Sequence, residues 1–96
     1  MKIGAVGLGN RIAHVFHELS QINKNAELIS YVDPLPIGKE YAEKHNFFPS
    51  KNYSNLKEML NNEKLDLLMV GSPNHLHLEQ IKVGLNSGIK IFAEKP

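Results

Sequence analysis

The sequence predicts an α/β fold of the Rossmann-like type, a doubly wound parallel sheet in three α/β/α layers. Short apolar runs alternate with amphipathic stretches along all 96 residues, which is typical of parallel strands joined by right-handed helical crossovers. Gly7 and Gly9 separate the first apolar run from the first amphipathic stretch, where such a fold makes a tight strand-to-helix turn. With 42% hydrophobic residues, a chain of this length is expected to form one domain, residues 1–96.

Four apolar runs are expected to form buried strands, because each is too short for a helix and ends at glycine, proline or polar residues. These runs are residues 3–6, 28–32, 65–70 and 89–93. Pro34 helps to end the second run, since a proline favours an extended residue before it and donates no hydrogen bond to a ladder. Residues 47–49 are expected to add a brief extended piece.

The first helix is expected to begin near Ile12 and to stop at residues 23–25. Its apolar residues recur at spacings of three and four, which defines one buried face. They are Ile12, Val15, Phe16, Leu19 and Ile22. A second, shorter helix over residues 37–46 should be mostly solvated, because charged residues surround Tyr41 and Ala42.

Two more helices follow in the second half of the chain. Ser54 or Asn55 can cap the third helix, because a side-chain oxygen there can accept hydrogen bonds from the first turn. Its expected buried residues are Leu56, Met59 and Leu60.

The fourth helix is expected from about His75 to Asn86. Leu78, Ile81 and Leu85 should form its buried face, because they share the helical spacing. Gly88 should close this helix, since glycine enters the left-handed conformation of a C-cap without a steric penalty.

Composition excludes several classes of protein. The 11 Lys+Arg residues nearly balance the 10 Asp+Glu residues, and Arg11 is the single arginine, so the basic stripe of a nucleic-acid-binding protein is missing. The absence of cysteine excludes a disulfide framework, a thiolate zinc site and a cysteine nucleophile. No apolar run approaches the ~18 residues of a membrane-spanning helix, and the N-terminus turns polar too early for a signal peptide. We therefore expect a soluble, cytoplasmic protein without nucleic-acid or membrane partners.

The glycine loop lies where ligands bind in an open parallel sheet, beyond the carboxyl end of a strand. Gly7 and Gly9 leave room for a pyrophosphate to approach the N–H groups at the start of the following helix. Ile12 occupies the third position of the G-x-G-x-x-G pattern, so the helix should stay further from the first strand than a glycine would permit. A strand-to-helix turn without a ligand is the alternative interpretation.

An acidic residue follows the second strand at the spacing that this interpretation requires. Asp33 lies 24 residues after Gly9, near the ~20-residue spacing at which a carboxylate accepts hydrogen bonds from the adenosine ribose hydroxyls. Residues 34–38 contain no arginine that could hold a 2′-phosphate, so the sequence predicts NAD in preference to NADP. The alternative role for Asp33 is that of a turn residue before proline.

Two further segments follow the later strands, Ser72-Pro73-Asn74-His75-Leu76-His77 and Glu94-Lys95-Pro96. Together with the glycine loop and the Asp33-Pro34 turn, they resemble the N-terminal cofactor domain of the Gfo/Idh/MocA oxidoreductase family over essentially the whole chain. Members of that family are pyridine-nucleotide oxidoreductases that act mostly on sugars, inositols and related polyols. A second, sheet-rich domain supplies much of their substrate pocket.

The resemblance implies a role for each matching residue. Gly7, Gly9, Asn10 and Arg11 are expected at the cofactor pyrophosphate, and Asp33 at the adenosine ribose. Ser72, Pro73, Asn74 and His77 are expected beside the nicotinamide half, with Glu94 near its ribose. Lys95 is the expected catalytic residue, because an ammonium beside a reacting hydroxyl can orient it and stabilise developing negative charge.

The resemblance also implies a cofactor, a substrate class and a domain boundary. NAD is the expected cofactor and a sugar, inositol or related polyol the expected small-molecule substrate, and self-association into a homo-oligomer is compatible with the family. The family continues beyond its Glu-Lys-Pro segment into the substrate domain. We therefore expect residues 1–96 alone to fold marginally, to expose apolar surface, to bind NAD weakly and to show no turnover.

Three other functions compete with this one. The chain could be a non-catalytic nucleotide-binding or assembly module, or a methyltransferase-like domain, which also uses a glycine loop and an acid after the second strand. A metal site could use the pair His14 and His17 or the pair His75 and His77. We favour solvated or capping histidines and no metal, because the sequence shows no nearby carboxylate that completes a ligand set.

Overall fold

Among the residues that the structure describes, five parallel strands form one sheet in the order β3-β2-β1-β4-β5, with β1 at its centre. The computed structural model describes residues 1–33, 37–45, 51–72 and 74–93. The strands are β1 (Lys2–Val6), β2 (Glu27–Val32), β3 (Lys51–Asn52), β4 (Leu67–Val70) and β5 (Lys90–Ala93). The order reverses at β1, so its carboxyl end is the topological switch point at which doubly wound sheets bind ligands.

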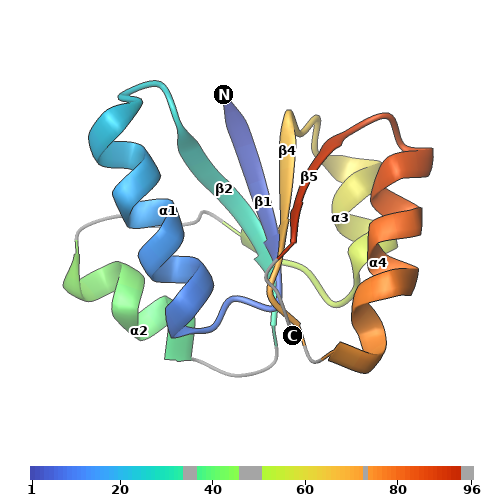
Figure 1. Cartoon of the computed structure of the whole chain (residues 1–96), viewed down its shortest axis with the longest axis horizontal. Helices are drawn as coiled ribbons and strands as arrows, with labels where there is room; N and C mark the ends of the chain where they lie inside the picture. Colours follow the sequence, from blue (N-terminus) through green and yellow to red (C-terminus); the bar gives the residue numbers. More distant parts are fainter. Residues whose placement is uncertain (34–36, 46–50, 73, 94–96) are drawn as a thin grey trace.

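In the described ranges, four helices cover the sheet, two on each face (Figure 1). They are α1 (Asn10–Ile22), α2 (Ile37–Lys44), α3 (Leu56–Asn62) and α4 (Asn74–Asn86). Figure 1 shows α1 and α2 on one side of the sheet and α3 and α4 on the other. The predicted three-layer α/β/α architecture is therefore confirmed. Within the described residues, no helix is long and apolar enough to span a membrane.

The core has two parts, one on each face of the sheet. Beneath α1 and α2 it contains Ile3, Ala5, Leu8, Ile12, Ala13, Phe16, Ala26, Leu28, Tyr31 and Met69. Beneath α3 and α4 it contains Val6, Tyr53, Leu56, Met59, Leu65, Leu68 and Val70. The β1–β2 register skips Ile29, since Ile3 pairs with Leu28 and Gly4 pairs with Ser30.

The first three predicted helices are confirmed. Ile12 and Phe16 are buried, although Ile22 at the end of α1 is 85% exposed. Asn55 rather than Ser54 caps α3, because its side chain accepts a hydrogen bond of 2.8 Å from the backbone of Glu58. Met59 is fully buried as predicted.

The predicted buried face of α4 is wrong. Leu78 and Leu85 are 66% and 58% exposed, whereas Ile81 packs against the core beneath α3 and α4. The helix meets the sheet through Gly84, where an added Cβ would lie 2.5 Å from Ile91 Cδ1. A glycine lets the helix approach the strands closely, so the buried face is rotated away from the two leucines. Gly88 ends the segment at φ 75°, which confirms the predicted left-handed turn.

The short strand near the middle of the chain also differs from the prediction. Residues 47–49 lie outside the described residues, and the strand that pairs with β2 is β3, at Lys51–Asn52. The prediction followed the apolar residues. Two exposed polar residues form this edge strand instead.

Candidate functional site

The carboxyl ends of β1, β2 and β4 meet at one edge of the sheet, at the lower edge in Figure 1. Two backbone hydrogen bonds join these ends: Gly7 donates to the carbonyl of Val32 at 2.8 Å, and Gly71 donates to that of Val6 at 2.9 Å. Asp33 and Ser72 directly follow these bonded residues. The structure therefore brings the predicted glycine loop, Asp33 and Ser72 to one place.

The fold itself requires a glycine at position 7. Gly7 has φ 79°, a left-handed conformation that favours glycine, and an added Cβ would lie 2.3 Å from the backbone nitrogen of Ser72. Gly38 at the start of α2 also lies close to the loop, since its Cβ would lie 2.0 Å from the carbonyl oxygen of Leu8. The glycine loop is thus held between α2 and the loop that follows β4.

Gly9 differs, because no described atom around it requires a glycine. Its φ of −91° and ψ of −178° suit any residue, and an added Cβ would meet no described atom within 4 Å. Gly9 is the N-cap of α1, yet no side-chain cap is found there among the described residues, and the first turn of α1 contains no acidic residue. Its backbone N–H groups and the positive end of the helix dipole therefore suit an anion.

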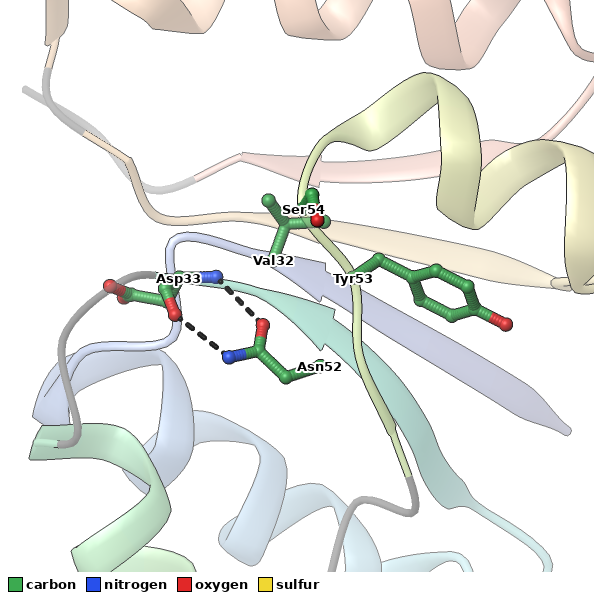
Figure 2. A pocket seen from close by; sticks show the side chains of 5 residues that line it. All are labelled: Val32, Asp33, Asn52, Tyr53 and Ser54. Carbon is green, nitrogen blue, oxygen red and sulfur yellow. Dashed lines mark hydrogen bonds between the residues drawn. The ribbon is translucent and has the colours of Figure 1, made fainter.

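Asp33 is held by a residue that the sequence analysis missed. The side-chain amide of Asn52 donates to the carbonyl of Asp33 at 3.1 Å, and the backbone N–H of Asp33 approaches Asn52 Oδ1 at 3.4 Å. Figure 2 shows the two hydrogen bonds on one side of Asp33 and the carboxylate directed away from Asn52. Asn52 is the last residue of β3, a strand that the sequence analysis expected at residues 47–49, so its position at a strand end was missed.

A hollow of about 280 Å³ lies beside this pair. It is lined by Val32, Asp33, Asn52, Tyr53 and Ser54. Burial and the negative charges of Asp33 and Glu43 raise the pKa of the Tyr31 hydroxyl. The carboxylate of Asp33 therefore makes the end of β2 negatively charged, which suits hydroxyl donors better than a further anion.

Tyr53 also lines the hollow, and in Figure 2 its ring points away from Asp33 and Asn52. Its hydroxyl donates a hydrogen bond of 2.6 Å to Glu63 Oε2. The hydrogen bond and burial raise the pKa of Tyr53 to about 12. The interaction joins the segment after β3 to the end of α3.

Ser72, the predicted residue after β4, is buried and donates a hydrogen bond to Gln80 of α4. Gln80 was not among the predicted residues. It lies two turns into α4, and only the packing of that helix against the end of β4 brings it to Ser72.

The remaining predicted positions are only partly described. Asn10 is the first residue of α1 and is followed by the exposed Arg11, while Asn74 and His77 lie in the first turn of α4. Pro73, Glu94 and Lys95 lie outside the described residues, so their roles stay predictions.

Of the two histidines of α1, His14 is exposed and His17 is partly buried. His14 Nδ1 is 2.9 Å from the hydroxyl of Tyr41, and the rings of His17 and His45 are 4.8 Å apart. In the part of the chain that the structure describes, no three histidine or acidic side chains are placed to hold a metal ion.

Comparison with known proteins assigns the family. Residues 1–96, the whole chain, match the model of the oxidoreductase family with an NAD-binding Rossmann fold named GFO_IDH_MocA. The chain belongs to the Gfo/Idh/MocA oxidoreductase family. The resemblance in the loop motifs is thereby confirmed.

This Gfo/Idh/MocA chain is similar to several dehydrogenases. A scyllo-inositol 2-dehydrogenase (NADP(+)) of Bacillus subtilis is 39% identical over 57 residues, which are 59% of this chain and 17% of the relative. The WlbA dehydrogenase of Chromobacterium violaceum, solved with NADH and UDP-GlcNAcA, superposes with a TM-score of 0.80 at 26% identity. The scyllo-inositol dehydrogenase of Lactobacillus casei, solved with NAD(H) and scyllo-inositol, superposes with a TM-score of 0.74 at 30% identity.

The chain covers only part of these relatives. Both superpositions include 100% of this chain, but only 27% of the WlbA dehydrogenase and 28% of the Lactobacillus casei enzyme. What the chain shares with them is the Rossmann fold of an NAD-binding oxidoreductase family.

Proposed function

We propose that this chain is the cofactor-binding part of an NAD-dependent oxidoreductase that transfers a hydride between nicotinamide and a sugar, inositol or related polyol. The observation that carries the proposal is the open N-terminus of α1 at Gly9, at the same sheet edge as Asp33. The two features match the two charged or polar parts of a dinucleotide, its pyrophosphate and its adenosine ribose.

The α1 end suits the pyrophosphate because it offers backbone donors that no side chain caps in the part of the chain that the structure describes. A side chain at position 9 would enter space that no described protein atom uses, so a ligand accounts for this glycine better than packing does. Gly7 serves the fold, and Gly9 serves the ligand. Asn10 and the exposed Arg11 begin the same helix, and Arg11 adds positive charge close to the proposed pyrophosphate.

Asp33 suits the ribose because a carboxylate accepts hydrogen bonds from two neighbouring hydroxyls. It also repels a 2′-phosphate, and residues 34–38 contain no arginine that could hold that group. We therefore propose NAD in preference to NADP, although the Bacillus subtilis relative is named for NADP(+).

The loop after β4 and the Glu94-Lys95 segment would serve the nicotinamide half and the substrate. The cofactor supplies the hydride chemistry. Ser72, held by Gln80, with Pro73, Asn74 and His77 would line the nicotinamide side, and Glu94 would lie near its ribose. Lys95 would orient the substrate hydroxyl and stabilise negative charge on its oxygen.

Titration calorimetry with NADH and NADPH tests the cofactor half of the proposal. We expect tighter binding of NADH, and a loss of roughly tenfold or more for Asp33→Ala because two charged hydrogen bonds disappear. Asp33→Asn, of the same shape, should lose NADH affinity and gain relative affinity for NADPH. Tighter NADPH binding by the unaltered protein, unchanged affinity in Asp33→Ala, or tighter binding of S-adenosylmethionine than of NADH would contradict the assignment.

Turnover of the full protein tests the catalytic half. A panel of inositols, sugars and nucleotide sugars with NAD should yield NADH, and Lys95→Ala should lose turnover while keeping NADH affinity. Lys95→Arg is the matched control, because it keeps the positive charge but not the geometry or the pKa of an ammonium. NADH binding without turnover of any polyol would favour the alternative, a non-catalytic nucleotide-binding module.

A further inference from the structure

We propose that Asn52 is a positioning residue for Asp33, and that it orients the Asp33 carboxylate toward the 2′-hydroxyl of the adenosine ribose. The inference rests on the proposed function and goes beyond it, because Asn52 acts on the cofactor through the backbone of Asp33. Neither the glycine loop nor the motifs of the later strands include this residue.

Asn52 lies at the end of the short ladder between β2 and β3. The pairing of β2 with β3 consists of Ser30 with Lys51 and Tyr31 with Asn52. Tyr53 then donates from its backbone to the carbonyl of Tyr31 at 2.8 Å, and the chain continues toward α3. No residue of β3 is left to pair with the backbone of Asp33.

The side chain of Asn52 takes the place of that missing residue. A carboxamide carries the same donor and acceptor as a peptide group, and Asn52 directs both to Asp33, at 3.1 Å and 3.4 Å. The ladder is thereby extended by one residue, to Asp33, whose side chain we propose for the ribose. Pro34, which follows, has no N–H with which to continue the ladder.

Holding the backbone of Asp33 matters because the carboxylate has to meet two hydroxyls at defined angles. In Figure 2 the carboxylate points away from Asn52, so the amide leaves its oxygens to other partners. Without the two hydrogen bonds from Asn52, cofactor binding would also have to order the backbone at the end of β2. The free-energy cost of this ordering would lower the affinity for the cofactor. The loss should appear specifically in the recognition of the hydroxyl.

The test compares NADH with its analogue that carries 2′-deoxyadenosine, using calorimetry on the full chain. The affinity for NADH divided by the affinity for the analogue reports on the 2′-hydroxyl alone. We expect Asn52→Ala to lower this ratio roughly three- to tenfold, the value of one oriented hydrogen bond. Asn62→Ala is the matched control: it removes another exposed asparagine that donates to a backbone carbonyl, that of Glu58 at 2.8 Å, and it should leave the ratio unchanged.

A double-mutant cycle separates positioning from direct contact. If Asn52 acts through Asp33, Asn52→Ala has no further effect on the ratio in the Asp33→Ala background. An equal loss of affinity for both ligands, or a full effect of Asn52→Ala in that background, would overturn the inference. If Asn52→Ala does not fold, Asn52→Asp decides by the same ratio, since it keeps the shape and the acceptor but lacks the donor.

The inference and the proposed function fail in different ways. If Asp33→Ala lowers the ratio and Asn52→Ala does not, the ribose assignment stands and the role of Asn52 is wrong. If Asp33→Ala itself leaves the ratio unchanged, the ribose assignment is wrong, and the role of Asn52 is wrong with it.

Discussion

The side chain of Ile12 packs against the backbone at Gly71, and the two residues are complementary in size. A Cβ on Gly71 would lie 2.1 Å from Ile12 Cγ1 and 2.7 Å from the carbonyl oxygen of Gly7. Ile12 occupies the third glycine position of the dinucleotide pattern and is only 1% exposed. The missing glycine of α1 is therefore matched by a glycine at the end of β4, which gives the larger side chain its space.

This complementarity predicts that Gly71→Ala destabilises the protein. The added methyl has to displace Ile12, so we expect the free energy of unfolding to fall by about 1–3 kcal/mol in urea titrations. Ile12→Ala by itself should cost about 2–5 kcal/mol, and less than that in the Gly71→Ala background. Strictly additive effects of the two substitutions would show that the side chains do not compete for space.

Gly9→Ser should separate stability from cofactor binding. Serine is a preferred N-cap and has room at position 9, but glycine is nearly as favourable there, so the free energy of unfolding should stay the same or rise by roughly a few tenths of a kcal/mol. Its hydroxyl would accept from the N–H groups proposed for the pyrophosphate, and NADH affinity should fall roughly tenfold or more. Calorimetry and urea unfolding measure the two effects. Unchanged NADH affinity would argue against a pyrophosphate at this helix end.

Tyr53 predicts a loss of stability in strong alkali. The pKa of Tyr53 is about 12 in the fold against 10.0 for an unperturbed tyrosine, so the folded state keeps the phenolic proton up to a higher pH than the unfolded state does. The stabilisation is complete below pH 10 and is lost as the pH rises through 12. Urea midpoints of the unaltered protein and of Tyr53→Phe should therefore converge across this range. A constant difference between them would contradict the role of the Glu63 hydrogen bond. Tyr31, whose pKa is also raised, remains in both proteins.

Ser30→Ala should leave stability unchanged or increase it. The hydroxyl of Ser30 is fully buried on β2 and has no hydrogen-bond partner among the described residues. Its removal relieves the cost of burying an unsatisfied polar group, which offsets the small cavity that remains. Ser72→Ala is the contrasting variant, because it breaks the hydrogen bond to Gln80 and should cost about 1 kcal/mol. A larger cost for Ser30→Ala than for Ser72→Ala in thermal or urea unfolding would refute this account.

The strands and helices could be predicted where one face of an element is strongly apolar. The run at residues 3–6 and the face of α1 through Ile12 and Phe16 are both buried. The prediction was wrong for α4, because counting leucines ignores how near a helix can come to a sheet. Gly84 permits that close approach, and Leu78 and Leu85 are left at the surface.

The candidate site could be predicted only where its residues lie directly after an apolar strand. Gly7, Asp33 and Ser72 follow such strands and lie together. Asn52 and Gln80 could not be found in this way, because Asn52 is part of a polar edge strand and Gln80 lies within a helix. Each reaches the site through a side-chain hydrogen bond that depends on how distant elements pack.

By itself, the sequence determined the alternation of strands and helices, the parallel sheet and the loops at its carboxyl ends, because local periodicity and glycine or proline boundaries specify them. Only the tertiary structure decided which of the two loop glycines is required by packing, how Ile12 and Gly71 share one space, and that Asn52 holds Asp33. These relationships join residues far apart in the chain. They depend on distances of a few ångströms, which no local pattern contains.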